Sequence, residues 1–301
     1  MRELTVTRRD GALLTGYLAG SAGPAIVLAN GLGGPVSAFR HQVRHFERHY
    51  RVVSWDYRGL YRSGGATPPA RVDVGAQAED LEDLLDAARV SSAVLVGWSM
   101  GVQVALELAL RSPSRVSELV LINGAHGRPM ANLRVPHVSS VLPFLVERAR
   151  LHHRMGSRLA ARVARWRLGA DLARRLRLVS PRLGSDEILA LASEFQALDF
   201  DVYLRTLAAL EHHDPSAALG QVTARTLVIA GGRDPLFSSS VGRRLSERLA
   251  RAELYVVPKA THYAPLEFPE LVNARIDAFL AAGVRDRARP DGAAAAGARA
   301  D

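Results

Sequence analysis

A serine lies between two glycines at the point where the sequence changes from strand-like to helix-like. The segment is GWSMG, residues 97–101, with the apolar β-branched run 93–96 before it and the apolar run 102–110 after it. Glycine is needed at so tight a turn, because larger residues would collide at its flanks. A G-x-S-x-G segment between a strand and a helix holds its serine, here Ser99, in a strained conformation that exposes the hydroxyl. The positive N-terminal end of the helix points at the same place, where it would stabilise negative charge that develops in acyl transfer.

Strand-like and helix-like segments alternate on both sides of this turn. The strands are expected at 4–7, 13–18, 25–29, 52–55, 93–96, 118–122, 226–230 and 253–257, and the helices at 35–48, 74–88, 102–110, 239–249 and 269–280. This order predicts a doubly wound α/β fold, a mainly parallel sheet with helices on both faces.

The alternation stops between residues 126 and 218, where no strand pattern occurs and the periodicity is helical. We therefore expect an α/β core made of residues 1–125 and 219–282, with a helical cap at 126–218 inserted after the sixth strand. Residues 283–301, which include an alanine run, are expected to form a disordered tail.

Composition bounds the class of protein. The 301 residues are 48% hydrophobic, enough for one α/β domain with an insertion, and the absence of cysteine excludes disulfides and thiolate nucleophiles. The N-terminus has no signal-like apolar region, and no apolar run reaches the roughly 18 residues of a membrane span, so a cytoplasmic protein without stable membrane insertion is expected. The net charge is +9, almost entirely from arginine, but no nucleic-acid-binding motif accompanies it and no nucleic-acid partner is expected.

Two other strand ends carry residues that would complete a nucleophilic site. Asp234 lies just past the strand at 226–230, and His262 lies in the loop after the strand at 253–257. Alone, the first would be an ordinary turn aspartate and the second a surface histidine. Together with Ser99 they follow predicted strands in the order serine, aspartate, histidine, which favours a catalytic triad. His262 would take the proton of Ser99, and Asp234 would orient the imidazole.

With these motifs the chain resembles the α/β-hydrolase superfamily, in particular its capped, esterase-like members, over about residues 10–281. Residues 30–34 (NGLGG) are similar to the family's His-Gly-x-Gly loop, and residues 56–63 are similar to its D-x-R-G-x-G-x-S loop. The resemblance implies that the backbone N–H groups of Leu32 and Met100 form an oxyanion hole.

Two positions depart from the family pattern. Asn30 replaces the usual histidine, and Tyr61 replaces a glycine, which is expected to narrow or reshape the mouth of the pocket. Substrate contacts are expected from Asn30, Gly31 and Trp98, and Trp98 could equally pack behind the turn.

The function that the resemblance implies is that of a serine hydrolase, which cleaves an ester or related acyl substrate through an acyl-enzyme without cofactor or metal. A serine at the turn excludes the dehalogenases and epoxide hydrolases of this fold, which use aspartate there. Acyl transfer to another acceptor, peracid formation and carbon–carbon bond cleavage remain open, because the same triad can serve them. A non-catalytic, ligand-binding member of the fold is the alternative of a different class.

Two further patterns involve basic residues. One face of a predicted cap helix carries the arginines Arg150, Arg154, Arg158, Arg162 and Arg165. These side chains could simply be solvated on the outside of a lid. Alternatively, they could attract an acidic or lipid-like acyl substrate or an anionic membrane surface. His41, His45 and His49 share one face of the helix predicted at 35–48, but no carboxylates lie in register and no metal site is expected.

Overall fold

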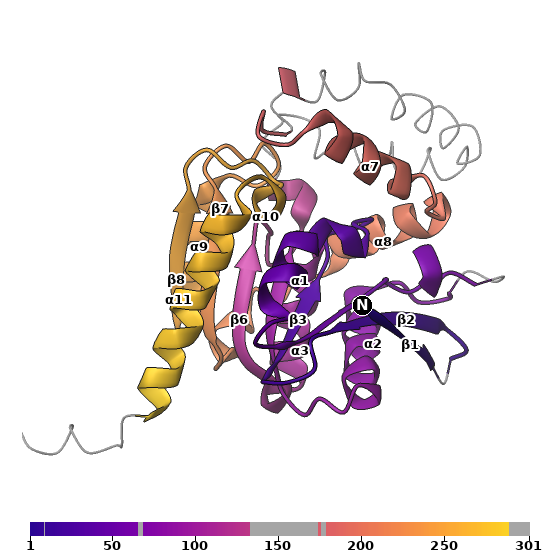
Figure 1. The fold of residues 1–301 in the computed structure, drawn as a ribbon, viewed down its shortest axis with the longest axis horizontal. Helices are drawn as coiled ribbons and strands as arrows, with labels where there is room; N and C mark the ends of the chain where they lie inside the picture. Colours follow the sequence, from indigo (N-terminus) through magenta and orange to yellow (C-terminus); the bar gives the residue numbers. More distant parts are fainter. Residues whose placement is uncertain (9, 66–68, 133–173, 176–178, 289–301) are drawn as a thin grey trace, which may run out of the picture.

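The computed structural model describes residues 1–8, 10–65, 69–132, 174–175 and 179–288 (Figure 1). Eight strands form one sheet in the order β1-β2-β4-β3-β5-β6-β7-β8. They are β1 (Arg2–Thr7), β2 (Leu13–Ala19), β3 (Ala25–Ala29), β4 (Arg51–Trp55), β5 (Ala93–Trp98), β6 (Val116–Ile122), β7 (Arg225–Gly231) and β8 (Ala252–Val257). Only β1–β2 and β2–β4 pair antiparallel, which confirms the mainly parallel sheet.

Helices cover both faces of this sheet. The core helices are α1 (Arg40–Phe46), α2 (Val74–Ala87), α3 (Met100–Arg111), α9 (Ser239–Arg248), α10 (Ala264–Glu267) and α11 (Pro269–Ala288). Side chains of α2 and α3 pack with one set of strand residues, such as Val27 and Leu95. Side chains of α1 and α11 pack with the alternate set, such as Ile26 and Val96. Every residue of β3 and β5 is buried, as expected for strands covered on both sides.

Short 3-10 turns join several of these elements. They are η1 (Val36–Phe39), η2 (Tyr61–Ser63), η3 (Pro113–Arg115), η4 (Pro129–Asn132) and η5 (Leu219–Gln221). The described helices include none that is long and apolar enough to cross a membrane.

The insertion after β6 contributes two described helices, α7 (Ser185–Phe195) and α8 (Phe200–His212). Figure 1 shows α7 at the end of the sheet to which the arrows of β6 and β8 point. Phe195 and Tyr203 lie directly over Gly33, since a Cβ atom placed there would be 2.6 and 2.9 Å from their rings. The insertion therefore covers the loop expected to form the oxyanion hole. The arginine-rich segment expected at 150–165 falls outside the described residues.

Two expected boundaries are wrong. The helix expected at 35–48 is the turn η1 followed by α1, which ends at Phe46, so His49 lies beyond it. The last helix continues to Ala288, and residues 283–288, expected in a disordered tail, are helical. Alanine and arginine favour helix strongly enough there to outweigh Gly283.

Candidate active site

The turn between β5 and α3 holds Ser99 in an unusual backbone conformation. Its φ is 56° and its ψ is −114°, a strained combination for a residue with a side chain. A Cβ atom on Gly97 would lie 2.3 Å from the carbonyl oxygen of Gly101, and one on Gly101 would lie 2.1 Å from that of Ala29. Both glycines are therefore required, because backbone atoms leave no room for side chains.

Asp234 and His262 lie at the ends of β7 and β8 and contact each other. The carboxylate oxygen Oδ2 of Asp234 is 3.0 Å from Nδ1 of His262. Its other oxygen, Oδ1, accepts hydrogen bonds from the backbone N–H groups of Leu236 (2.8 Å) and Phe237 (3.0 Å). Asp234 is fully buried, so these bonds fix its orientation. Its carboxylate thus holds the hydrogen of the imidazole on Nδ1 and leaves Nε2 able to act as a base.

The backbone around His262 is held from two other strands. Nε1 of Trp98 donates to the carbonyl oxygen of His262 at 2.8 Å. Nδ2 of Asn123, at the end of β6, donates to the carbonyl oxygens of Thr261 (2.7 Å) and His262 (3.0 Å). Asn123 also accepts from the N–H of Gly231 at 2.7 Å, so it joins the ends of three strands. Trp98 therefore packs behind the turn, and it also lines the cavity in front of Ser99.

A buried glutamate ties the loop of His262 to the insertion. Glu267, only 3% exposed, accepts hydrogen bonds from the N–H (2.8 Å) and the hydroxyl (2.6 Å) of Thr261. It also accepts from the N–H of Ser180, in the insertion, at 2.6 Å. Apolar contacts among Leu183, Leu266 and their neighbours surround this junction. The position of the histidine loop is thus coupled to the seating of the insertion.

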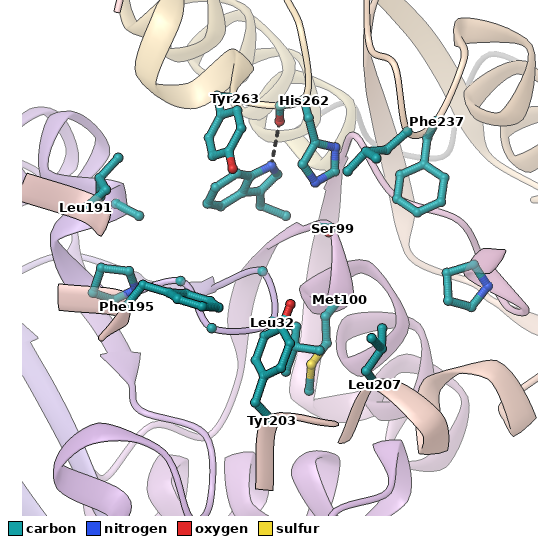
Figure 2. Close-up of a pocket in the computed structure, with 18 of the residues that line it drawn as sticks. Leu32, Ser99, Met100, Leu191, Phe195, Tyr203, Leu207, Phe237, His262 and Tyr263 are labelled. Atoms are coloured by element: carbon teal, nitrogen blue, oxygen red, sulfur yellow. Dashed lines mark hydrogen bonds between the residues drawn. The ribbon is translucent and has the colours of Figure 1, made fainter. Parts of the chain in front are cut away.

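Ser99 and His262 face a common cavity of about 560 Å³ (Figure 2). Its walls come from the core and from the insertion and are mostly apolar, as shown by Leu32, Trp98, Met100, Leu191, Phe195, Leu207 and Phe237. Among the lining residues that the structure describes, no side chain is charged at neutral pH apart from any charge on His262. Burial raises the pKa of the Tyr203 hydroxyl to about 12 and also raises the pKa of Tyr263, so both phenols lining the cavity stay protonated.

The expected oxyanion groups lie beside Ser99. A Cβ atom on Gly31 would be 3.2 Å from Cβ and 3.7 Å from Oγ of Ser99, so the loop of Gly31 and Leu32 touches the serine. Met100 is the first residue of α3, and its N–H has no acceptor within that helix.

The hydroxyl of Ser99 makes no hydrogen bond with any described residue, including His262. Proton transfer between them would require Oγ of Ser99 and Nε2 of His262 to come within hydrogen-bond distance.

The two departures from the family pattern lie behind this loop rather than in the cavity. Asn30, expected to contact substrate, does not line the cavity, although Gly31 does. Its side chain is buried, and neither of its polar atoms has a partner within the described residues. The hydroxyl of Tyr61 donates to the carbonyl oxygen of Gly33 at 2.6 Å and supports the loop from outside the cavity lining.

Three of these groups could not be found from local sequence patterns. Asn123 bonds to residues distant in the chain, as does Glu267 through Ser180, and the only local signal for Asn123 was its place at a strand end. Gly124 allows the close approach of β6, since a Cβ atom there would be 2.7 Å from the carbonyl oxygen of Ser99. Of the histidines on the surface of α1, His45 contacts a carboxylate of α11, with its Nε2 2.7 Å from Oδ2 of Asp277.

A strained serine before a helix, with an aspartate–histidine pair at neighbouring strand ends, defines a class of enzymes built on a mainly parallel sheet. A family model described as alpha/beta hydrolase fold matches residues 24–269, and the chain belongs to that family. It is a hydrolase of that fold. The matched segment contains Ser99, Asp234 and His262.

The chain is also similar to individual proteins along most of its length. It is 30% identical over 257 residues to the protein named "Putative carbamate hydrolase RutD" from Agrobacterium fabrum, covering 85% of this chain and 93% of that one. The structure of a hydrolase from Pseudomonas aeruginosa PA01 superposes with a TM-score of 0.70 at 27% identity, covering 92% of this chain and 98% of the other. An enol-lactonase from Burkholderia xenovorans LB400 gives a TM-score of 0.74 at 24% identity, with 92% and 100% covered, and shows the shared fold.

Proposed function

We propose that this protein is a serine hydrolase that cleaves an uncharged carboxylic ester or lactone through an acyl-enzyme formed on Ser99. The observation that carries the proposal is the 3.0 Å contact between Asp234 and His262 at the rim of the cavity that also holds the strained Ser99. Neither the fold alone nor the names of the relatives would identify the reacting groups.

The mechanism follows from the positions of these groups. Nε2 of His262 accepts the proton of Ser99 as Oγ attacks the substrate carbonyl, and it then returns the proton to the leaving oxygen. Asp234 holds the imidazole in the required tautomer and stabilises its cation. The N–H groups of Leu32 and Met100 stabilise the tetrahedral oxyanion, each at a typical value of about 3 kcal/mol. Water, activated by the same histidine, then releases the acid.

The cavity supports an uncharged, partly apolar substrate rather than an acidic one. Burying a carboxylate without a cationic partner is costly, and the described lining supplies no arginine or lysine. A volume of about 560 Å³ is in the usual range for pockets that enclose a small molecule. The relative named as a carbamate hydrolase adds carbamates to the substrates that should be tested.

Replacement of Ser99 by alanine tests the proposal directly. We expect Ser99→Ala to lower kcat/KM for p-nitrophenyl esters at least about a thousandfold, because alanine lacks the hydroxyl on which the acyl-enzyme would form. Ser240→Ala, at an exposed serine of α9, is the matched control and should retain activity. A fluorophosphonate probe should label the wild type and the control but not Ser99→Ala. Equal labelling of all three proteins would refute the role of Ser99.

A further inference from the structure

Gln103 is the only side-chain amide among the described residues that line the cavity. It lies on α3, four residues after Ser99, which places it about 6 Å further along the helix axis. The residue is 2% exposed. A buried amide in a mostly apolar wall is costly unless its hydrogen-bonding groups are used.

One end of this amide is held by a residue of the insertion. Oε1 of Gln103 is 2.8 Å from Nδ1 of His213, the residue that follows α8. Nε2 of His213 is 3.0 Å from Oε2 of Glu107, one turn further along α3. The hydrogen bond with His213 is the main cause that lowers the pKa of Glu107, so this side chain is a carboxylate at neutral pH.

This chain of contacts fixes which end of the amide is free. Oε2 of Glu107 and Oε1 of Gln103 can only accept, so the ring of His213 makes both hydrogen bonds as the doubly protonated cation, donating from Nε2 to Glu107 and from Nδ1 to Gln103. The acceptor of the amide is thereby occupied. Its donor Nε2 has no hydrogen-bond partner in the part of the chain that the structure describes, although the residue lines the cavity. Nε2 is therefore the end of the amide that is available to an oxygen of a ligand in the cavity.

We propose that Gln103 determines specificity by donating a hydrogen bond from Nε2 to an oxygen of the substrate. The inference rests on the proposed function and narrows its substrate class. The favoured substrate is an uncharged ester or lactone that carries a second acceptor oxygen, as an ether, hydroxyl or carbonyl group, a few atoms from the scissile carbonyl. A plain alkanoate of the same length leaves the donor unpaired and is discriminated against.

Isosteric esters measure this preference. In p-nitrophenyl methoxypropanoate and ethoxyacetate an oxygen replaces one methylene of p-nitrophenyl pentanoate, so length and leaving group stay constant. After correction for the rates of spontaneous hydrolysis, we expect the wild type to prefer the better of the two ethers by at least about tenfold in kcat/KM. In Gln103→Leu this ratio should fall to near one.

A second variant tests the amide without removing it. His213→Gln should reduce the ether preference severalfold, because Oε1 of Gln103 loses its fixed donor. His212→Gln, at the exposed neighbouring position, should leave the preference unchanged. A wild type without preference for either ether, or a preference that survives in both Gln103→Leu and His213→Gln, would overturn the inference.

The outcome stays separable from that of the proposed function. If Ser99 is labelled by the fluorophosphonate and esters are cleaved, a flat ether-to-alkyl ratio rejects only the role of Gln103. If no ester is cleaved, binding is measured instead of hydrolysis. The ligands are the three methyl ketones that carry the same acyl groups as the esters, and tryptophan fluorescence reports their dissociation constants. Tighter binding of an ether ketone that is lost in Gln103→Leu would then support the inference, and equal dissociation constants would refute it.

Discussion

Replacement of Glu267 by glutamine should weaken the site without any change in the residues that touch substrate. The carboxylate accepts three hydrogen bonds, from two groups of Thr261 and from the N–H of Ser180. Glutamine keeps the shape but turns one accepting oxygen into a donor. Whichever way the amide is oriented, one buried backbone N–H, that of Thr261 or that of Ser180, faces another donor.

The expected cost follows from that one lost acceptor. An unsatisfied buried donor costs about 1–3 kcal/mol, so the free energy of unfolding should fall by about that amount in Glu267→Gln. Thr261 directly precedes His262, and a displacement of about 1 Å at a catalytic group can lower the rate about a hundredfold. We therefore expect kcat to fall about 10- to 100-fold while KM changes little, because the cavity walls remain.

Urea unfolding followed by circular dichroism gives the free energy, and hydrolysis of a p-nitrophenyl ester by the folded variant gives kcat and KM. Glu270→Gln is the matched control, since Glu270 is exposed on α11 three residues away. An unfolding midpoint and a kcat of Glu267→Gln equal to those of the control would show that the bonds of Glu267 do not position His262. A loss confined to KM would contradict the argument as well.

Two further predictions concern the turn and the loop behind it. Gly101→Ala should unfold at much lower urea concentration or fail to fold, because its Cβ would lie 2.1 Å from a backbone oxygen. Gly220→Ala is the control and should unfold at a urea concentration close to that of the wild type, because no atom lies within 4 Å of the new Cβ. Asp80→Ala should lower the free energy of unfolding by about 1.5–3 kcal/mol in the urea assay, because hydrogen bonds to charged groups contribute about that much. The buried Arg58, whose Nε contacts Asp80 at 2.7 Å, would keep Asp10, at 3.0 Å, as a carboxylate partner. Asp86→Ala, with its exposed side chain, is the control, and equal losses in the two aspartate variants would contradict the prediction.

Local sequence patterns were sufficient to predict the sheet and the turn at Ser99. Buried parallel strands are short apolar runs, and a tight strand-to-helix turn requires glycines at fixed positions, so both leave a signal within a few neighbouring residues. The order Ser99, Asp234, His262 was readable for the same reason, because each residue lies within five residues of the end of a strand. The catalytic roles of these three residues and of the amides of Leu32 and Met100 stay predictions.

Contacts between distant segments left no such signal. The bonds of Gln103 to His213 and of Ser180 to Glu267 join residues 110 and 87 positions apart, and nothing in the local sequence selects these partners. Asn30 was assigned to the substrate by its place in a motif, but side-chain direction depends on packing, and the side chain lies outside the cavity lining. The end of α11 was also misplaced, since one glycine late in a helix does not terminate it.

The insertion contributes to this site through two separate contacts. Through Ser180 it contacts Glu267, which accepts hydrogen bonds from the loop of His262, and through His213 it contacts the amide of Gln103, which lines the cavity. Both contacts are made by residues at the ends of the described insertion segments rather than by the apolar faces that form the cavity wall. Sequence changes in the insertion can therefore alter substrate preference through Gln103 while the sheet, the turn at Ser99 and the aspartate–histidine contact remain as they are. Changes that unseat the insertion at Ser180 should instead lower kcat for all substrates alike, because they act on the histidine loop.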